Sequence, residues 1–320
     1  MMKHIKYIIP LLVMGISLFV SCSNDDDGTD STFIPARDRG EEVVRATNII
    51  EEYLTTHFYN YEEFQNPPAD FDFRIKFDTI AGDNADKIAL IEQVESKTVQ
   101  DRVNEDVSYT LYYLDALEGA GEKPNFPDLA TISYEGTYLN VPFEDEDGSL
   151  ENFSPYTKIF DSSIVPVKFD MTNVVNGLQD GLIEFKTAST IITNPDGTVT
   201  FEEFGVGAVF MQSGLGYYVD VPAGSNIPLY SQLIFTLQMY ESEIGDQDGD
   251  GIPSFMEDLN NNGLEEDDDT DGDLAPNYSD ADDDGDGRPT SDEIVVNADG
   301  SITFPDEDND GTPDYLDSDS

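Results

Sequence analysis

The chain has 320 residues, of which 38% are hydrophobic, and its formal net charge is −53, from 68 acidic and 15 basic residues. This length allows about two domains of ordinary size. The scarcity of Lys and Arg excludes nucleic acid as a partner, because neutralising phosphates requires basic side chains. Cations are the natural counterpart of so acidic a chain.

Residues 1–21 have the pattern of an export signal. Two lysines give a basic start, residues 8–20 form an apolar run, and Ser21 precedes Cys22, the only cysteine. The run is short for a membrane span. The segment resembles a bacterial lipoprotein signal, which implies that Cys22 becomes the lipidated first residue and anchors the chain to a membrane. An ordinary secretory signal or a membrane anchor is the alternative.

Residues 22–34 are polar and are predicted to form a solvated tether. The run Ser23–Asp27, which contains three aspartates, lies directly after the cysteine. It resembles the acidic signals of Bacteroidetes lipoproteins, which implies an outer-membrane lipoprotein that faces the periplasm or the cell surface. With its single cysteine assigned to lipid, the chain can form no internal disulfide, so we expect stability from packing and bound metal.

Residues 35–104 are predicted to form an α+β extension. A helix is expected over about residues 41–58, and a half-buried strand over residues 71–77, where aromatic and charged residues alternate. The helical stripe comprises Val43, Ala46, Ile50, Tyr53, Leu54 and His57. His57 is interpreted as a packed histidine rather than a metal ligand, because the only other histidine lies in the signal. No chemistry is assigned to this region.

Residues 105–243 contain short strands broken by Gly, Pro and Asp, with one helical segment near residues 172–185. This pattern predicts an α+β fold in which an antiparallel sheet wraps around a short helix. Extra residues lie between 186 and 204, with a hairpin turn expected at 194–197. Seven sequence blocks stand out: Val107–Leu111, Ile132–Gly136, Lys158–Ser163, Val174–Leu178, Ser213–Tyr217, Ile227–Pro228 and Leu233–Phe235.

In this order the blocks resemble those of FKBP-type peptidyl-prolyl cis-trans isomerases. The resemblance covers roughly residues 105–242. It implies an FKBP-like fold, proline-containing polypeptide substrates, and catalysis without a cofactor. The matching pocket positions are Tyr134, Phe160, Asp161, Val175, Leu178, Tyr217, Ile227 and Phe235. The resemblance also implies that the Asp161 carboxylate lies near the twisted carbonyl carbon and that the Tyr217 hydroxyl donates to a substrate carbonyl.

Three positions depart from the pattern of that family. Leu178 stands where a Trp is common, Val167 where an aromatic residue is common, and Tyr218 where a glycine is usual. We therefore expect a wider and less aromatic pocket. A cleft that binds proline-containing segments without catalysis stays an alternative. A further alternative is that single residues such as Phe160 belong to the ordinary apolar core.

Residues 246–320 contain 27 acidic residues and one basic residue, Arg288. They match a calcium-loop template five times, with oxygen ligands at positions 1, 3, 5 and 12 and glycine at position 6. Leu274 replaces that glycine in the third loop. The candidate ligands are Asp246, Asp248, Asp250 and Glu257; Asp258, Asn260, Asn262 and Asp269; Asp269, Asp271, Asp273 and Asp280; Asp282, Asp284, Asp286 and Glu293; and Asp306, Asp308, Asp310 and Asp317.

Proline at position 8 of four loops argues against EF-hands, since it would break an exiting helix. The region, taken as residues 244–320, resembles thrombospondin type-3 calcium repeats, which implies structural Ca²⁺. A disordered acidic tail is the alternative.

The sequence as a whole predicts a lipid-anchored prolyl isomerase of the bacterial envelope with calcium-binding repeats. The enzyme would act by desolvating and twisting Xaa-Pro bonds in an apolar pocket. Two alternatives stay open. One is a surface lipoprotein with a catalytically weak FKBP-like cleft, and the other is a structural or adhesive calcium-binding lipoprotein.

Overall fold

The structure is a computed structural model that describes residues 36–140 and 156–320. The predicted signal, the tether and Cys22 lie outside the described residues. The described residues from Arg37 onward form one compact unit. Within the described part of the chain, no helix has both the length and the apolar character needed to cross a membrane.

Three α-helices and twelve strands are present in the described residues. The helices are α1 (Arg39–Thr56), α2 (Tyr61–Gln65) and α3 (Asn176–Leu182). The strands are β1 (His57–Tyr59), β2 (Phe77–Thr79), β3 (Glu95–Gln100), β4 (Ser108–Leu117), β5 (Leu129–Asn140), β6 (Tyr156–Asp170), β7 (Thr190–Thr193), β8 (Val199–Glu202), β9 (Gly205–Met211), β10 (Leu233–Glu243), β11 (Val295–Val296) and β12 (Ile302–Thr303). Short 3-10 helices include η3 (Met171–Asn173) and η4 (Ser213–Leu215).

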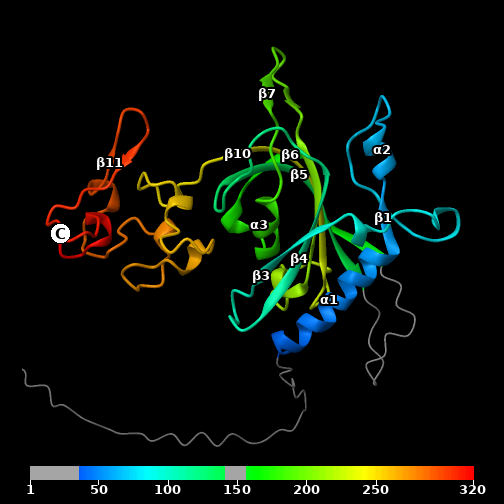
Figure 1. The fold of residues 1–320 in the computed structure, drawn as a ribbon, viewed down its shortest axis with the longest axis horizontal. Helices are drawn as coiled ribbons and strands as arrows, with labels where there is room; N and C mark the ends of the chain where they lie inside the picture. The colour runs from blue at the N-terminus through cyan, green and yellow to red at the C-terminus, as the bar shows by residue number, and fades with distance from the viewer. Residues whose placement is uncertain (1–35, 141–155) are drawn as a thin grey trace, which may run out of the picture. The chain divides into compact units, whose positions relative to one another are not determined.

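Six strands form one sheet in the order β3-β4-β9-β10-β5-β6 (Figure 1). Every neighbouring pair is antiparallel. The prediction of an α+β fold built on an antiparallel sheet with few helices is confirmed. The late strands β9 and β10 lie at the centre of the sheet, between strands that precede them in the sequence.

The central strand β9 is buried along its whole length. Successive side chains point to opposite faces of a strand. Val206, Ala208 and Phe210 pack in the apolar cluster that includes α1, whereas Val209 and Met211 pack in the cluster that includes α3. The sheet is therefore the middle layer of the fold, with α1 on one face and α3 on the other.

Helix α1 begins after Asp38, whose carboxylate accepts a hydrogen bond from the Glu41 N–H at 3.0 Å and so caps the first turn. Its buried face packs against β4, β9 and β10 and comprises Ala46, Ile49, Ile50, Tyr53 and Leu54. The helix predicted over residues 41–58 is confirmed, with both ends two residues earlier. It stops at Thr56 because His57 already pairs with Thr79 in the β1–β2 ladder.

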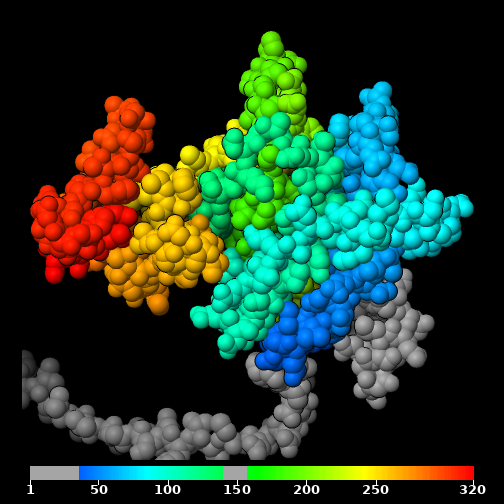
Figure 2. Space-filling view, viewed as in Figure 1, coloured from blue at the N-terminus to red at the C-terminus, as the bar shows by residue number. Residues whose placement is uncertain are grey.

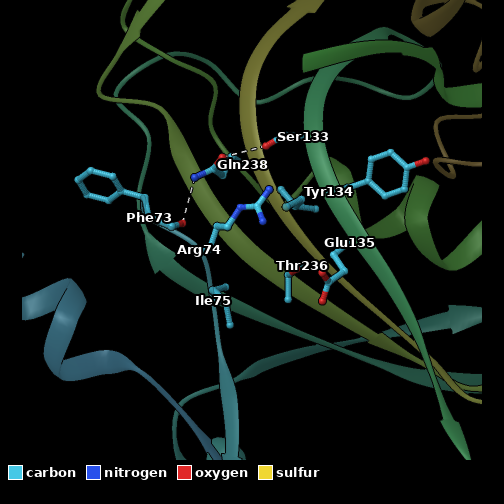
Figure 3. Close-up of a pocket in the computed structure, with 9 residues that line it drawn as sticks. Phe73, Arg74, Ile75, Ser133, Tyr134, Glu135, Thr236 and Gln238 are labelled. Carbon is cyan, nitrogen blue, oxygen red and sulfur yellow. Dashed lines mark hydrogen bonds between the residues drawn. The ribbon is translucent and has the colours of Figure 1, made fainter. Parts of the chain in front are cut away.

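The strand predicted over residues 71–77 is wrong in its backbone, although its alternating burial is present. Only Phe77–Thr79 forms a ladder, and Phe73 has a φ of 55°, which a regular strand does not allow. Figure 3 shows this segment beside β5 and β10, where the Gln238 side chain donates to the Phe73 carbonyl at 3.1 Å. Packing against the sheet buries every second side chain of this segment, although the segment has no partner strand.

The extension over residues 35–104 shares its core with the following region. Its strand β3 is an edge strand of the six-stranded sheet and pairs with β4. The predicted boundary after residue 104 therefore falls inside the sheet. The extension supplies both a strand and the layer that covers one face.

The extra residues between 186 and 204 form the hairpin β7–β8, with the turn at the predicted residues 194–197. The Asn194 N–H bonds to the Thr198 carbonyl at 2.8 Å, and Gly197 takes a φ of 86°, which favours glycine. Figure 2 shows this hairpin, in green, projecting from the surface. Most of its side chains are exposed, so it adds little to the core.

Candidate functional site

A cavity of about 390 Å³ lies between β5, β6 and β10 on one side and η3 and α3 on the other. Its lining is mostly apolar and aromatic, which suits an extended apolar ligand. The residues that line it are Tyr134, Phe160, Asp161, Phe169, Thr172, Asn173, Val174, Val175, Leu178, Tyr217 and Phe235.

The structure brings together seven of the eight pocket residues predicted from the sequence. Ile227 is the exception, because it is 5% exposed and packs in the core cluster without lining the cavity. The sequence reasoning missed Phe169 and the neighbouring Thr172, Asn173 and Val174. The last three lie between β6 and α3, so they reach the cavity from the turn that joins these two elements.

The aromatic rings form a connected wall. Phe160 meets Tyr217 edge-on with ring centres 6.2 Å apart, and it meets Phe235 edge-on at 5.7 Å. Tyr134 meets Phe169 edge-on at 5.4 Å. Such contacts hold each ring in place, since edge-to-face pairs are favourable beyond the area they bury.

The polar groups of the cavity gather at Asp161. Its Oδ2 accepts a hydrogen bond from the Tyr134 hydroxyl at 2.6 Å, and its Oδ1 accepts one from the Ser162 N–H at 2.9 Å. Burial raises the pKa of Tyr134 and that of Tyr217, and the Asp161 charge adds to both effects. The Tyr217 hydroxyl has no hydrogen-bond partner among the described residues, so it is available to a ligand.

The floor of the cavity is Leu178, which is 4% exposed. The sequence analysis placed Val167 where the related pattern has an aromatic residue, and this assignment is corrected. Val167 pairs with Ile132 and does not line the cavity, whereas Phe169 does. The pairing of β5 with β6 shifts between Ile132 and Tyr134, with extra residues on β6. Spacing along such a bulged strand does not reveal which side chain faces the pocket.

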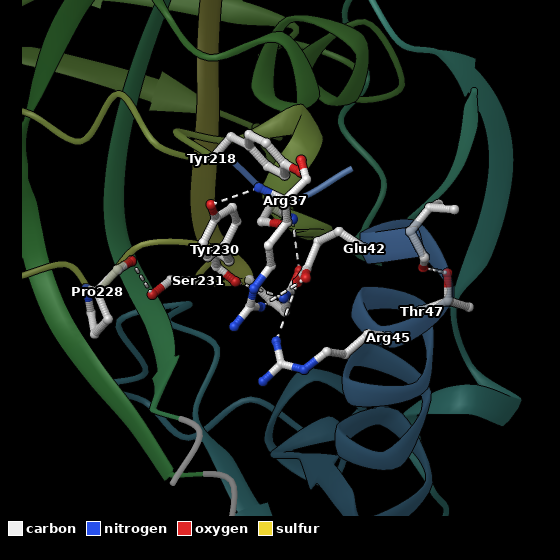
Figure 4. Close-up of polar contacts among 11 residues, drawn as sticks. Arg37, Glu42, Arg45, Thr47, Tyr218, Pro228, Tyr230 and Ser231 are labelled. Atoms are coloured by element: carbon white, nitrogen blue, oxygen red, sulfur yellow. Dashed lines mark hydrogen bonds and ion pairs between the residues drawn. The ribbon is translucent and has the colours of Figure 1, made fainter. Parts of the chain in front are cut away.

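Tyr218, which stands where the related pattern has glycine, has a φ of 49°. A tyrosine is strained in this conformation, and three contacts hold it there. Its hydroxyl donates to the Arg37 carbonyl at 2.7 Å, its ring meets Tyr230 edge-on at 4.9 Å, and the Arg39 guanidinium lies 4.3 Å from the ring centre. Figure 4 shows Tyr218 and Tyr230 beside Arg37. The substitution thus ties the loop after Tyr217 to the start of α1.

The five acidic loops share one local geometry. In each, the side-chain oxygen at position 5 accepts a hydrogen bond from the N–H at position 7, over 2.6–2.8 Å. This Asx turn directs alternate side chains to one side. The donors at position 7 are Ile252, Leu264, Ala275, Arg288 and Thr312, and the acceptors are Asp250, Asn262, Asp273, Asp286 and Asp310.

Short 3-10 helices, rather than α-helices, follow the prolines at position 8. Pro253, Pro276, Pro289 and Pro313 directly precede η5 (Ser254–Met256), η7 (Asn277–Ser279), η8 (Thr290–Asp292) and η9 (Asp314–Leu316). The second loop has Glu265 at this position, at the start of η6 (Glu265–Asp267). The described loops therefore lack the exiting helix of an EF-hand.

Carboxylates at positions 1, 3 and 5 converge in four loops, where their oxygens lie within 4.8 Å of one another. In the first loop, both Glu257 oxygens and one oxygen each of Asp248 and Asp250 are buried without a hydrogen-bond partner. Burial, aided by neighbouring carboxylates, raises the pKa of Glu257 to about 10 and that of Asp248 to about 7. Buried, unpartnered carboxylates fit a hard cation.

The second loop, residues 258–269, differs from the other four. Its Asn260 and Asn262 side chains donate to the Asp267 carboxylate at 3.0 and 2.8 Å, so they have partners within the protein. Asp269, which the template shares between two loops, is placed with Asp271 and Asp273 of the third loop. Of the five loops, the second is the least suited to a cation.

Positions 4 and 6 have positive φ in all five loops. Glycine or Asn occupies them except at Leu274, where φ is 84° and the side chain is 91% exposed. Leucine is strained in this region of φ, and nothing in the surroundings of so exposed a side chain offsets the cost.

Leu274→Gly should stabilise the loop region. Relief of backbone strain outweighs the added freedom of glycine in the unfolded chain, for a net gain of about 1 kcal/mol. Chemical denaturation in saturating Ca²⁺ measures the change. Leu259→Gly is the matched control, because Leu259 is also exposed but lacks positive φ. If Leu274→Gly lost as much stability as the control, Leu274 would not be strained by its positive φ.

Comparisons with known proteins give partial matches. A family model described as BamM C-terminal matches residues 247–305, in the acidic loops. No curated protein matches the chain. A crystal structure of a peptidyl-prolyl cis-trans isomerase from Pseudomonas syringae is similar at 13% identity and a TM-score of 0.34, over 65% of this chain and 98% of that one. FkpA from Escherichia coli is similar at 18% identity and a TM-score of 0.31, over 63% of this chain and 62% of that one. At these TM-scores the likenesses do not establish a shared fold.

Proposed function

We propose that the chain is a peptidyl-prolyl cis-trans isomerase whose site is the cavity above Leu178. The observation that carries this proposal is the convergence of Phe160, Asp161, Tyr217 and Phe235 from three separate sequence blocks on one apolar cavity. Their order in the chain is the one that the FKBP resemblance implies.

The chemistry requires no cofactor. Rotation about a peptide bond must break amide resonance at a cost of about 18–20 kcal/mol, and both isomers are populated before proline. The twisted amide loses its polar resonance character, so an apolar wall that excludes water favours it over the planar form. Asp161 would face the twisted carbonyl carbon, while the Tyr217 hydroxyl would hold a neighbouring carbonyl.

A second candidate is a cleft that binds proline-containing segments without accelerating their isomerisation. The Leu178 floor favours this alternative, because a leucine side chain offers less flat apolar area to a proline ring than an indole does. Binding and catalysis are separated by measuring both on the same protein.

Isomerisation of short Xaa-Pro peptides by the full chain tests the proposal. We expect acceleration over the spontaneous rate, with kcat/KM reduced about tenfold by Tyr217→Phe, since one hydrogen bond to the substrate is lost. Tyr217→Phe should leave the thermal unfolding temperature unchanged, because its hydroxyl has no partner among the described residues. Peptide binding without acceleration, across a range of residues before proline, would establish the binding alternative.

We further propose that the acidic loops hold structural Ca²⁺. Support comes from the converging carboxylates of four loops and from the buried, unpartnered oxygens of the first. The ligand set is all oxygen, which suits Ca²⁺ rather than a softer metal. Without a cation, so many like charges would repel one another.

The lipid anchor at Cys22 and the outer-membrane location are part of the proposal and rest on the sequence resemblances alone. They would place both the cleft and the loops where Ca²⁺ is available outside the cytoplasm. Protease added to intact cells distinguishes a surface-facing chain, which is cleaved, from a periplasmic one, which is not. In a structural or adhesive lipoprotein the loops would be the functional part, and loss of isomerase activity would leave that role intact.

A further inference from the structure

Asp283 lies in the fourth loop at position 2, which the calcium-loop template leaves without a role. It is 2% exposed, and its carboxylate lies within 4.8 Å of those of Asp250 and Glu257 in the first loop. These two residues are 5% and 1% exposed. Three acidic groups from two loops, distant in sequence, are therefore buried together.

None of these carboxylates is fully satisfied by the protein. Both oxygens of Asp283, both of Glu257 and Oδ2 of Asp250 are buried and have no hydrogen-bond partner among the described residues. Burying one unpaired charge is costly, and placing three like charges side by side adds to the cost. Three such carboxylates buried together require a positive counter-charge.

The backbone around Asp283 holds its side chain in this position. Its N–H donates to the Thr290 hydroxyl at 3.2 Å, just as the Gln247 N–H donates to the Ser254 hydroxyl at 3.2 Å in the first loop. Both hydroxyl-bearing residues are fully buried. The same backbone-to-hydroxyl hydrogen bond thus closes both loops and fixes the backbone of each.

A small apolar core lies beside the cluster. Ile252 of the first loop, Ile294 just after the fourth, and Tyr315 of the fifth form it, and all are less than 10% exposed. The charges of Asp283, Glu257 and Asp250 also contribute to raising the pKa of Tyr315, as burial chiefly does. The acidic cluster therefore sits against an apolar wall, where water cannot easily stabilise bare charge.

We propose that one Ca²⁺ ion is shared between the first and fourth loops, held by Asp250 and Glu257 from one and Asp283 from the other. This inference rests on the proposed calcium binding of the loops and adds a ligand that their template does not contain. The ion joins segments 26 residues apart or more, from Glu257 to Asp283. Filling the site locks the two loops together, whereas the other loops each close on themselves.

Calcium titration of the decalcified full chain, by isothermal titration calorimetry, tests this proposal. We expect Asp283→Asn to lose one bound ion, or to weaken one site at least tenfold, because the amide keeps the shape but removes the charge. The control is Asp292→Asn, an exposed carboxylate of the same loop that belongs to none of the ligand groups, and its titration should match the wild type.

Terbium provides a second readout that does not depend on the stability of Asp283→Asn. Tb³⁺ in the shared site should emit on excitation of Tyr315, and Tyr315→Phe should reduce that emission while the number of bound Ca²⁺ ions stays the same. If the wild type binds no Ca²⁺, the calcium function itself fails. If the wild type binds Ca²⁺ and Asp283→Asn binds it equally, the loops bind cations but the shared site is absent.

Discussion

Chelation of calcium should unfold residues 246–320 and leave the sheet and its two helices folded. The loop region has only three buried apolar side chains in its own cluster, Ile252, Ile294 and Tyr315, so packing alone gives it little stability. At a free Ca²⁺ concentration ten times Kd, each occupied loop gains about 1.4 kcal/mol. Four occupied loops would then contribute about 6 kcal/mol, enough to decide whether the region is ordered.

Hydrogen exchange with and without EDTA measures this prediction residue by residue. Loss of protection confined to residues 246–320 is the expected result. The strands β9 and β10 are the internal control, since their protection depends on the sheet core. Equal protection of the loops in EDTA and in Ca²⁺ would show that the region is ordered without a cation.

Phe160→Ala should reduce isomerisation of Xaa-Pro peptides by roughly tenfold to a hundredfold. The ring contacts both Tyr217 and Phe235, so its removal opens the apolar wall and admits water to the bond that must twist. The effect should appear in kcat/KM measured with the full chain. Unfolding temperature is recorded in parallel, because the ring also packs against the core.

Ile159→Ala is the matched control for Phe160→Ala. Ile159 is the preceding residue on β6 and is 56% exposed, and it does not line the cavity. Its variant should retain wild-type activity. Equal loss of activity in both variants would point to damage to β6 rather than to the pocket wall.

The features that could best be predicted from the sequence are those set by residues close together in the chain. The five loops follow from Asp and Asn at alternate positions, because each Asx turn is closed by residues two apart. Helix α1 was predictable from its apolar stripe, and Phe160, Asp161 and Tyr217 from ordered blocks. These signals are contained within a few residues of the chain.

Positions that depend on distant packing were missed. Phe169 reaches the cavity because of a shift in the β5–β6 pairing, which spacing on one strand cannot reveal. The segment over residues 71–77 has the burial of a strand but lies against side chains rather than a partner strand. Asp283 approaches Glu257 only once two loops pack together. Each depends on a contact between segments far apart in sequence.

The order of the strands also sets the course of folding. Helix α1 ends at Thr56, yet the strands that it covers include β9, which begins at Gly205. Roughly 150 residues must be made before that contact can form, and contacts of such long range slow folding. Until then the apolar face of α1 has no strand to cover it, so the growing chain would depend on chaperones to keep it from aggregating.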